Sequence, residues 1–369
     1  MQEYIKELKK TDLSFCENAS SFLQSAMWGE FKSRFGWTTL SIQVEWSFGD
    51  IQESTPLLVL CRRLAPGFSF AYIPWGPQLP ADFPASEIPL AMKELAKKLK
   101  TFLAKTCVFA RFEPAWAMSN RTLDSEQLTM NNEQSPLQFG VEFVAHGFKK
   151  APVTVQAPDT VIVDLSASCE EILAAMKPKW RYNVLLAGKK DVKVSVSAGN
   201  ELETFYNILK ETAQRDGISI HSFSYYKTLF EVCETQKNDG YLRLYTASHE
   251  GEVLAGIVVL FRGKEATYLY GASSNNKRNL MAPYALQWQA MQDAKEAGCL
   301  SYDLFGIPPD EDPNHPMAGL YRFKTGFGGR IVHRMNGIDY PYKKFFYFLF
   351  GLVERLRKKM MDRKKGRKR

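Results

Sequence analysis

Two segments of the chain repeat one order of elements: a strand, a loop, an amphipathic helix and a second strand. The first copy begins at "FSFAYIPWGP", continues through a helix expected at residues 86–106 and ends at "CVFARFEPAW". The second begins at "ATYLYGASSN", continues through a helix expected at 282–297 and ends at "CLSYDLFGIPP". In both copies the last strand opens on a cysteine and ends at a proline. The repeat predicts one α/β fold used twice along the chain.

The length agrees with this interpretation, since 369 residues are enough for about two domains. We expect a first domain at 1–152, a second at 153–330, and a C-terminal segment at 331–369 that returns to the first domain. Further strands are expected at 56–61, 192–196, 241–248 and 252–261. Further helices are expected at 21–35, 169–187, 201–216 and 224–236. The polar stretch 117–136 predicts a loop before the domain boundary.

The positive charge of the chain is concentrated at its C-terminal end. Residues 343–369 hold 12 Lys/Arg and 2 Asp/Glu, while the remainder holds 36 and 38, so the body is nearly neutral. The apolar run at 345–353 is too short to cross a bilayer and is followed by a basic segment. This pattern predicts a basic C-terminal helix, which either lies at an anionic membrane surface or docks on the body by its Phe face. The two placements are compatible.

Several classes of protein are disfavoured by what the sequence lacks. The six cysteines form no CxxC pair and the five histidines have no ligand spacing, so we expect neither a metal site nor disulfides, as in a reducing cytoplasm. The first residues carry charge and do not resemble a secretory signal. The motifs GxxxxGK[ST], GxGxxG, GxSxG and HExxH are missing. We therefore expect no cofactor, and a transfer between two bound substrates fits best.

Six motifs resemble, in order, those of the FemABX family. They are "WGEFKSRFGW", "YIPWGP", "KPKWRYNVLLAGKKDVKV", "YLYGASSNNKRNLMAPYALQWQAM", "DLFGIP" and "GLYRFKTGFGG", and together they span nearly the whole chain. The resemblance implies an α/β (α+β) fold of two tandem GNAT-type acyltransferase domains with mixed sheets. No helical-hairpin insertion is visible in the second domain, so the chain resembles the compact form. The implied activity is transfer of an amino acid from aminoacyl-tRNA to an amine of the peptidoglycan precursor stem peptide, which builds the interpeptide bridge in the cytoplasm. The precursor is either lipid-linked or UDP-MurNAc-pentapeptide.

Lys324 is the strongest catalytic candidate. It stands between Phe323 and Phe327 beside a cluster of glycines, and a lysine in such surroundings is costly unless a negative charge meets it. The resemblance implies that Lys324 lies where the two substrates meet and faces the oxyanion formed during transfer, an interaction that can supply about 3 kcal/mol. Phe323 would exclude water, and the glycines would let substrate approach. The alternative is a lysine salt-bridged within the fold. Asp303 is the candidate general base, although a substrate carboxylate or tRNA phosphate could serve instead.

Six further residues are candidates for binding the precursor. The resemblance implies that Lys32 meets its nucleotide-sugar or diphosphate part, as an ammonium suits phosphate. It also implies contacts from Tyr72, at the end of a strand, and from Arg181, which can grip an anion bidentately. For each of the three the alternative is an ordinary structural or solvated side chain. The other candidates are Tyr182, Tyr268 and Tyr270.

Tyr268 and Tyr270 are two residues apart in an expected strand, a spacing that predicts both rings on one face of the sheet. That face could equally be core.

Two other functions stay open. An N-acyltransferase would use a coenzyme A thioester, but GNAT enzymes hold its pyrophosphate with a glycine-rich turn where this chain has "NNKRNLMAPY". Pro283 also removes one N–H donor there. The other alternative is a non-catalytic protein that binds membrane or nucleic acid through its basic tail.

Overall fold

The computed structural model describes residues 2–117 and 139–366, which form parts of two compact units. Unit 1 comprises residues up to Pro158 together with those from His333 onward, and unit 2 comprises Asp159–Val332. The units therefore change at 158/159 and 332/333, where the sequence predicted 152/153 and 330/331. The loop predicted at 117–136 lies, apart from Ala117, outside the described residues.

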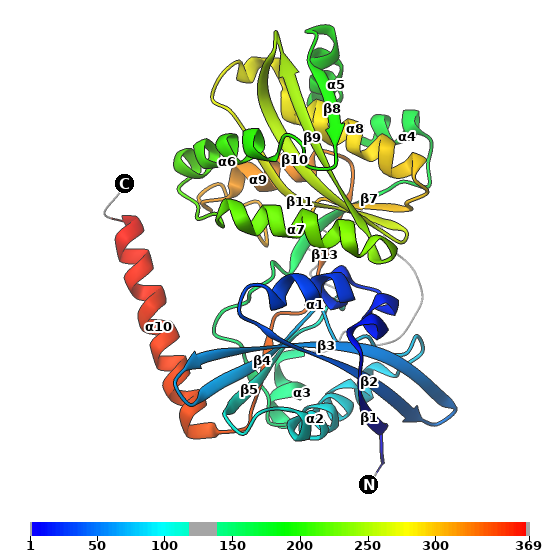
Figure 1. The fold of residues 1–369 in the computed structure, drawn as a ribbon, viewed down its shortest axis with the longest axis vertical. Coiled ribbons are helices and arrows are strands. Elements are labelled where there is room, and N and C mark those ends of the chain that lie inside the picture. The colour runs from blue at the N-terminus through cyan, green and yellow to red at the C-terminus, as the bar shows by residue number, and fades with distance from the viewer. Residues whose placement is uncertain (1, 118–138, 367–369) are drawn as a thin grey trace. The chain divides into compact units, whose positions relative to one another are not determined.

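Unit 1 is built on a mixed seven-stranded sheet in the order β1-β2-β3-β4-β5-β14-β6. Its strands are β1 (Ile5–Thr11), β2 (Thr38–Phe48), β3 (Ile51–Ala65), β4 (Phe68–Pro74), β5 (Cys107–Glu113), β6 (Lys149–Lys150) and β14 (Ile338–Pro341). Its helices are α1 (Ala26–Ser33), α2 (Ile88–Leu99), α3 (Phe139–Ala145) and α10 (Lys344–Gly366). Helices α1 and α2 cover opposite faces of the sheet (Figure 1), and the main core lies under α2. Because β14 pairs with both β5 and β6, the C-terminal segment is built into this unit.

Unit 2 carries a second mixed seven-stranded sheet, in the order β13-β7-β12-β11-β10-β9-β8. Its strands are β7 (Asp159–Asp164), β8 (Lys193–Ser197), β9 (Tyr241–His249), β10 (Glu252–Arg262), β11 (Glu265–Ser273), β12 (Ser301–Asp303) and β13 (Arg330–His333). Its helices are α4 (Cys169–Ala175), α5 (Pro178–Lys189), α6 (Leu202–Asp216), α7 (Phe223–Thr235), α8 (Ala282–Glu296) and α9 (Ala318–Thr325). The core lies between α8, α5 and one face of the sheet, while α6 packs on the other face, where the ring of Phe205 sits over Gly256.

The repeat that was visible in the sequence is confirmed as β4–α2–β5 in unit 1 and β11–α8–β12 in unit 2, with each strand pair parallel. A parallel pair needs a crossover, and in both units the crossover is an amphipathic helix. The predicted fold class, two tandem α/β domains with mixed sheets, is confirmed. No helical hairpin is inserted in unit 2, all of whose residues are described; its longest helices, α6 and α8, have 15 residues.

Three predicted elements are corrected by the structure. The single helix predicted at 169–187 is two helices, α4 and α5, because Pro178 keeps the preceding residue out of helical conformation. The helix predicted at 21–35 is a short 3₁₀ turn followed by the eight-residue α1, which Ser25 caps by accepting a hydrogen bond from the Trp28 amide. The last strand of the second repeat begins at Ser301 rather than at Cys299. Within residues 2–117 and 139–366, no helix combines the length and the apolar character that crossing a membrane needs.

Candidate functional site

Lys324 lies in the last turn of α9 and is almost entirely buried, with 5% of its surface exposed. Its Nζ donates hydrogen bonds to the backbone carbonyls of Phe305 and Gly306, each at 2.9 Å. The same ammonium lies 5.2 Å from the centre of the Tyr268 ring, a cation–π distance. The hydrogen-bond acceptors are neutral carbonyls rather than a carboxylate, so the positive charge is oriented but not neutralised by them.

Asp303 organises the loop that supplies those carbonyls. It follows directly from β12, is fully buried, and accepts hydrogen bonds from the Thr160 hydroxyl and, at 2.7 Å, from the Phe305 amide. Phe305 has a left-handed backbone with φ of 58°, which the Asp303 hydrogen bond helps to hold. A buried carboxylate with these two hydrogen-bond partners is suited to positioning the loop that follows β12. The geometry gives no support to the predicted role of Asp303 as general base.

The pKa of Lys324 is lowered to about 7, chiefly because burial penalises its charged form. The negative charge of Asp303 acts in the opposite direction and favours the ammonium. Lys324 therefore changes protonation state near neutrality.

Phe323, the residue before Lys324 in α9, belongs to a cluster of aromatic side chains. The Phe323 ring lies 5.1 Å from that of Phe327 and 5.3 Å from that of Tyr284, and the Trp180 indole donates a 2.8 Å hydrogen bond to the Phe323 carbonyl. A Cβ at Gly326 would lie 2.1 Å from the Trp180 indole, so only glycine fits there. The glycines were expected to admit substrate, but at this position the requirement is internal packing.

Tyr268 and Tyr270 lie on opposite faces of the sheet, and the prediction that they share one face is wrong. Adjacent residues of β10, Val259 and Val258, pair with Tyr268 and Tyr270, so Leu269 is an extra residue in a β-bulge. The bulge cancels the alternation that the spacing implied. Tyr268 accordingly lies with Lys324 on the core face, while the Tyr270 ring packs 5.1 Å from Tyr226 of α7.

Arg181 and Tyr182 lie in the first turns of α5 but do not share an environment. The Arg181 guanidinium donates to the carbonyls of Ala174 and Met176, where it closes the C-terminal end of α4. Tyr182 is 62% exposed. The structure thus brings Lys324, Asp303 and Tyr268 together in unit 2, whereas the Phe323 ring packs on Tyr284 and Phe327. The other unit 2 candidates lie outside that cluster.

A second cationic group lies in unit 1 around Lys32 of α1. Its Nζ lies 5.2 Å from the Trp28 ring and 5.8 Å from the Trp37 ring, and the Arg62 guanidinium lies 5.2 Å from the Trp37 ring. Burial and, second, the nearby charge of Arg62 lower the pKa of Lys32 to about 8. Two like charges beside one indole suit an anionic ligand, which would relieve their repulsion.

Tyr72 joins this group through Trp37, whose ring lies 6.0 Å away. The Tyr72 hydroxyl donates a 2.6 Å hydrogen bond to Glu113, so its proton is already engaged. Trp37 and Arg62 were missed by sequence reasoning. These two residues are brought together by the β2–β3 register, in which their chain neighbours Thr38 and Cys61 pair. That register could not be read from the sequence.

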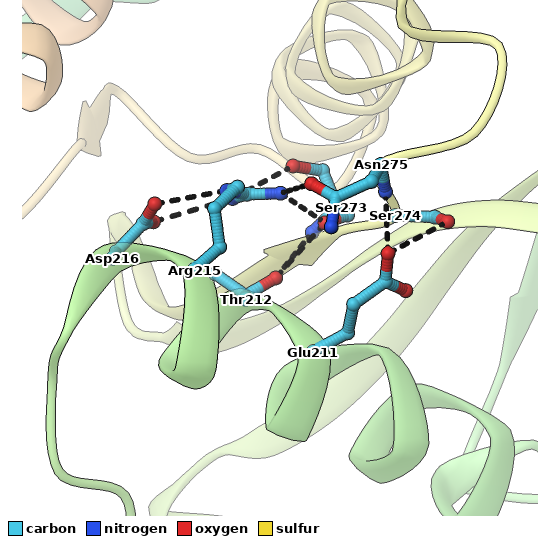
Figure 2. A network of polar contacts seen from close by, with 7 residues as sticks. All are labelled: Glu211, Thr212, Arg215, Asp216, Ser273, Ser274 and Asn275. Atoms are coloured by element: carbon cyan, nitrogen blue, oxygen red, sulfur yellow. Dashed lines mark hydrogen bonds and ion pairs between the residues drawn. The ribbon is translucent and has the colours of Figure 1, made fainter.

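The loop before α8 is closed by internal hydrogen bonds. Figure 2 shows Glu211 and Arg215 of α6 reaching Ser273–Asn275, with the Glu211 carboxylate accepting from the Asn275 amide at 2.7 Å. Farther along, the amides of Leu280 and Met281 donate to Lys277 and Arg278 carbonyls. In the segment where GNAT enzymes hold the coenzyme A pyrophosphate, one backbone N–H therefore already donates to a carboxylate. This arrangement disfavours coenzyme A as a ligand.

Comparison with known proteins agrees with the architecture and with the motif order. The model of the FemAB family matches residues 12–242 and 233–355. The lipid II:glycine glycyltransferases of Staphylococcus saprophyticus and Staphylococcus epidermidis are each 24% identical to this chain, covering 93% and 90% of it and 92% and 90% of their own length. A crystal structure of FemX superposes with a TM-score of 0.74 at 19% identity, over 94% of this chain and all of that one. The chain therefore belongs to the FemAB family, which confirms both the predicted family and the predicted enzyme class, an aminoacyltransferase.

Proposed function

We propose that the protein transfers an amino acid from aminoacyl-tRNA to an amine of the peptidoglycan precursor stem peptide and so builds an interpeptide bridge. Family membership supports the reaction class, and the glycyltransferase relatives act on a lipid-linked precursor. Charged tRNA is a cytoplasmic molecule, so we place the reaction at the cytoplasmic side of the cell.

The observation that carries the proposal is the hydrogen bonding of the buried Lys324 ammonium. An ammonium has three N–H donors, and the carbonyls of Phe305 and Gly306 accept two of them. The third can bond to the oxyanion that forms when the amine attacks the tRNA ester. Burial of Lys324 beside the Tyr268 ring lowers the local dielectric, so the charge interaction is stronger than it would be in water.

Lys32 is proposed to hold the diphosphate of the precursor, with Arg62 as a second cation beside it. A diphosphate carries charge on two groups, and the two side chains meet at Trp37. Tyr72 would contribute its ring and an oxygen lone pair, since its proton is donated to Glu113.

The transfer is tested by mixing purified protein with tRNA charged with each amino acid in turn, together with lipid-linked or UDP-linked precursor. We expect the precursor mass to rise by one residue for one or a few of the charged tRNAs. A protein that leaves the precursor unchanged with every charged tRNA, but acylates it from a coenzyme A thioester, would contradict the proposal.

The activity is expected to fall as the pH rises above about 7, because Lys324 must be protonated to meet the oxyanion. Its pKa in the folded protein lies below the ordinary lysine value, so the charge is present at lower pH and lost as the pH rises through about 7. Bound anions raise this pKa, so the falling limb of log kcat lies at or above that value. Lys324→Arg retains a charge at all accessible pH, and its residual activity should lack this limb. The same limb in both proteins would exclude Lys324 as its source.

A further inference from the structure

Helix α10 has two apolar faces, and unit 1 covers only one of them. On the covered face, Phe346 packs 4.6 Å from Phe68, and Phe350 packs 4.9 Å from Phe109. Tyr347 adds a 2.9 Å hydrogen bond from its hydroxyl to Asp339 of β14. These contacts fix the orientation of the first turns of the helix about its own axis.

The other face presents a continuous apolar stripe to solvent. Its members are Phe345, Phe348, Leu349, Leu352, Val353 and Leu356, all of them exposed, and Phe345 and Phe348 are more than 60% exposed. Phe345, Leu349, Leu352 and Leu356 recur at the spacing that aligns side chains along one side of a helix. Six large apolar side chains along one side of a helix form a larger apolar surface than the scattered apolar residues of an ordinary protein surface.

We propose that this stripe inserts into the interfacial layer of an anionic lipid bilayer and holds the protein on the membrane surface. The net charge of the same segment, 12 Lys/Arg against 2 Asp/Glu over residues 343–369, supplies the electrostatic attraction. A helix that combines an apolar stripe with a strong basic charge, and that cannot cross the bilayer, is the form that lies in the plane of the interface. The inference does not depend on the transferase reaction, although a lipid-linked precursor would lie in the same membrane.

The charge and the apolar stripe of the segment favour a membrane over two other partners, a second copy of the chain and an RNA. A second copy of the chain would bring two segments of net charge +10 together, and their repulsion opposes association through the stripe. An RNA would attract the basic residues but would leave the six apolar side chains in water. Only a surface that is both anionic and apolar satisfies the whole segment.

The test measures binding of the full-length protein to vesicles of phosphatidylcholine, with and without phosphatidylglycerol, by co-sedimentation at low and high salt. We expect strong binding only to the anionic vesicles, with weakening at high salt. The variant Phe345→Ser/Phe348→Ser/Leu356→Ser should bind these vesicles at least about tenfold more weakly, since three apolar side chains no longer enter the lipid. A control variant, Ile218→Ser/Leu300→Ser, changes two exposed apolar residues of unit 2 and should bind as the native protein does.

Several results would overturn the inference. One is equal binding of the triple variant and the native protein to anionic vesicles. A second is no vesicle binding by the native protein, with capture of an oligoribonucleotide through residues 343–369 instead. A third is a concentration-dependent dimer that the triple variant abolishes while vesicles have no effect. Transfer to the UDP-linked precursor in the absence of vesicles should be the same for all variants, so a failure of the membrane inference remains distinct from a failure of the proposed reaction.

Discussion

Replacement of Lys324 by alanine is expected to lower kcat by two to three orders of magnitude while the precursor still binds. The Lys324 charge is oriented by two carbonyl hydrogen bonds and lies buried over the Tyr268 ring, where one oriented donor to an oxyanion contributes about 3 kcal/mol. An interaction made only in the transition state changes kcat and leaves binding of the precursor nearly unaltered. Single-turnover kinetics with a charged tRNA, together with calorimetric titration of the precursor, measure the two effects separately.

A structural role for Lys324 must be separated from the chemical one. Without the ammonium, the carbonyls of Phe305 and Gly306 lose a buried hydrogen-bond donor. Each carbonyl left without a partner lowers the free energy of unfolding by about 1–3 kcal/mol. Added ethylamine supplies a small cation that can enter the vacated space, so partial rescue of kcat would identify chemistry rather than folding. Lys190→Ala changes an exposed lysine just after the C-terminal end of α5 and should behave as the native enzyme. An unchanged kcat in Lys324→Ala would refute the assignment.

The parts of the fold that follow from local periodicity could be predicted from the sequence. The two strand–helix–strand segments were recognisable because each helix presents an apolar face and each strand is a short apolar run, and both signals are contained within a few turns of chain. The break between α4 and α5 was also readable, since Pro178 marks it. That signal was outweighed by the apolar pattern on both sides of the break.

The parts of the candidate site that depend on pairing between distant strands could not be predicted. The bulge at Leu269 sends Tyr268 and Tyr270 to opposite faces, and a bulge follows from the register with β10 rather than from the composition of β11. In the same way, Asp303 holds the carbonyls that orient Lys324, and Thr160, which bonds to Asp303, is more than a hundred residues away in the chain. The sequence could suggest that Lys324 carries the functional charge, but it could not show which groups orient that charge.

Asp339→Ala is expected to destabilise unit 1 by about 3–5 kcal/mol, because it leaves the buried Arg111 charge without its partner. Arg111 donates two hydrogen bonds to the Asp339 carboxylate, at 2.7 and 2.8 Å, and both side chains are at least 95% buried. The Tyr347 hydroxyl donates to the same carboxylate, so the pair also secures the start of α10. A loss of this size lowers the melting temperature by roughly 10 °C, which differential scanning calorimetry would detect.

The comparison that isolates the unpaired charge is Arg111→Met/Asp339→Leu, which removes both charges and keeps apolar volume between β5 and β14. Replacement of a buried pair by apolar side chains is often neutral, so the double variant should recover most of the stability that Asp339→Ala loses. Glu30→Ala breaks the exposed ion pair between Glu30 of α1 and Arg34, the residue after that helix, and should cost less than about 1 kcal/mol. If the double variant were as unstable as Asp339→Ala, the packing and hydrogen bonds of the carboxylate, rather than the uncompensated guanidinium, would account for the loss. The C-terminal strand would then be held mainly by its ladder to β5 and β6.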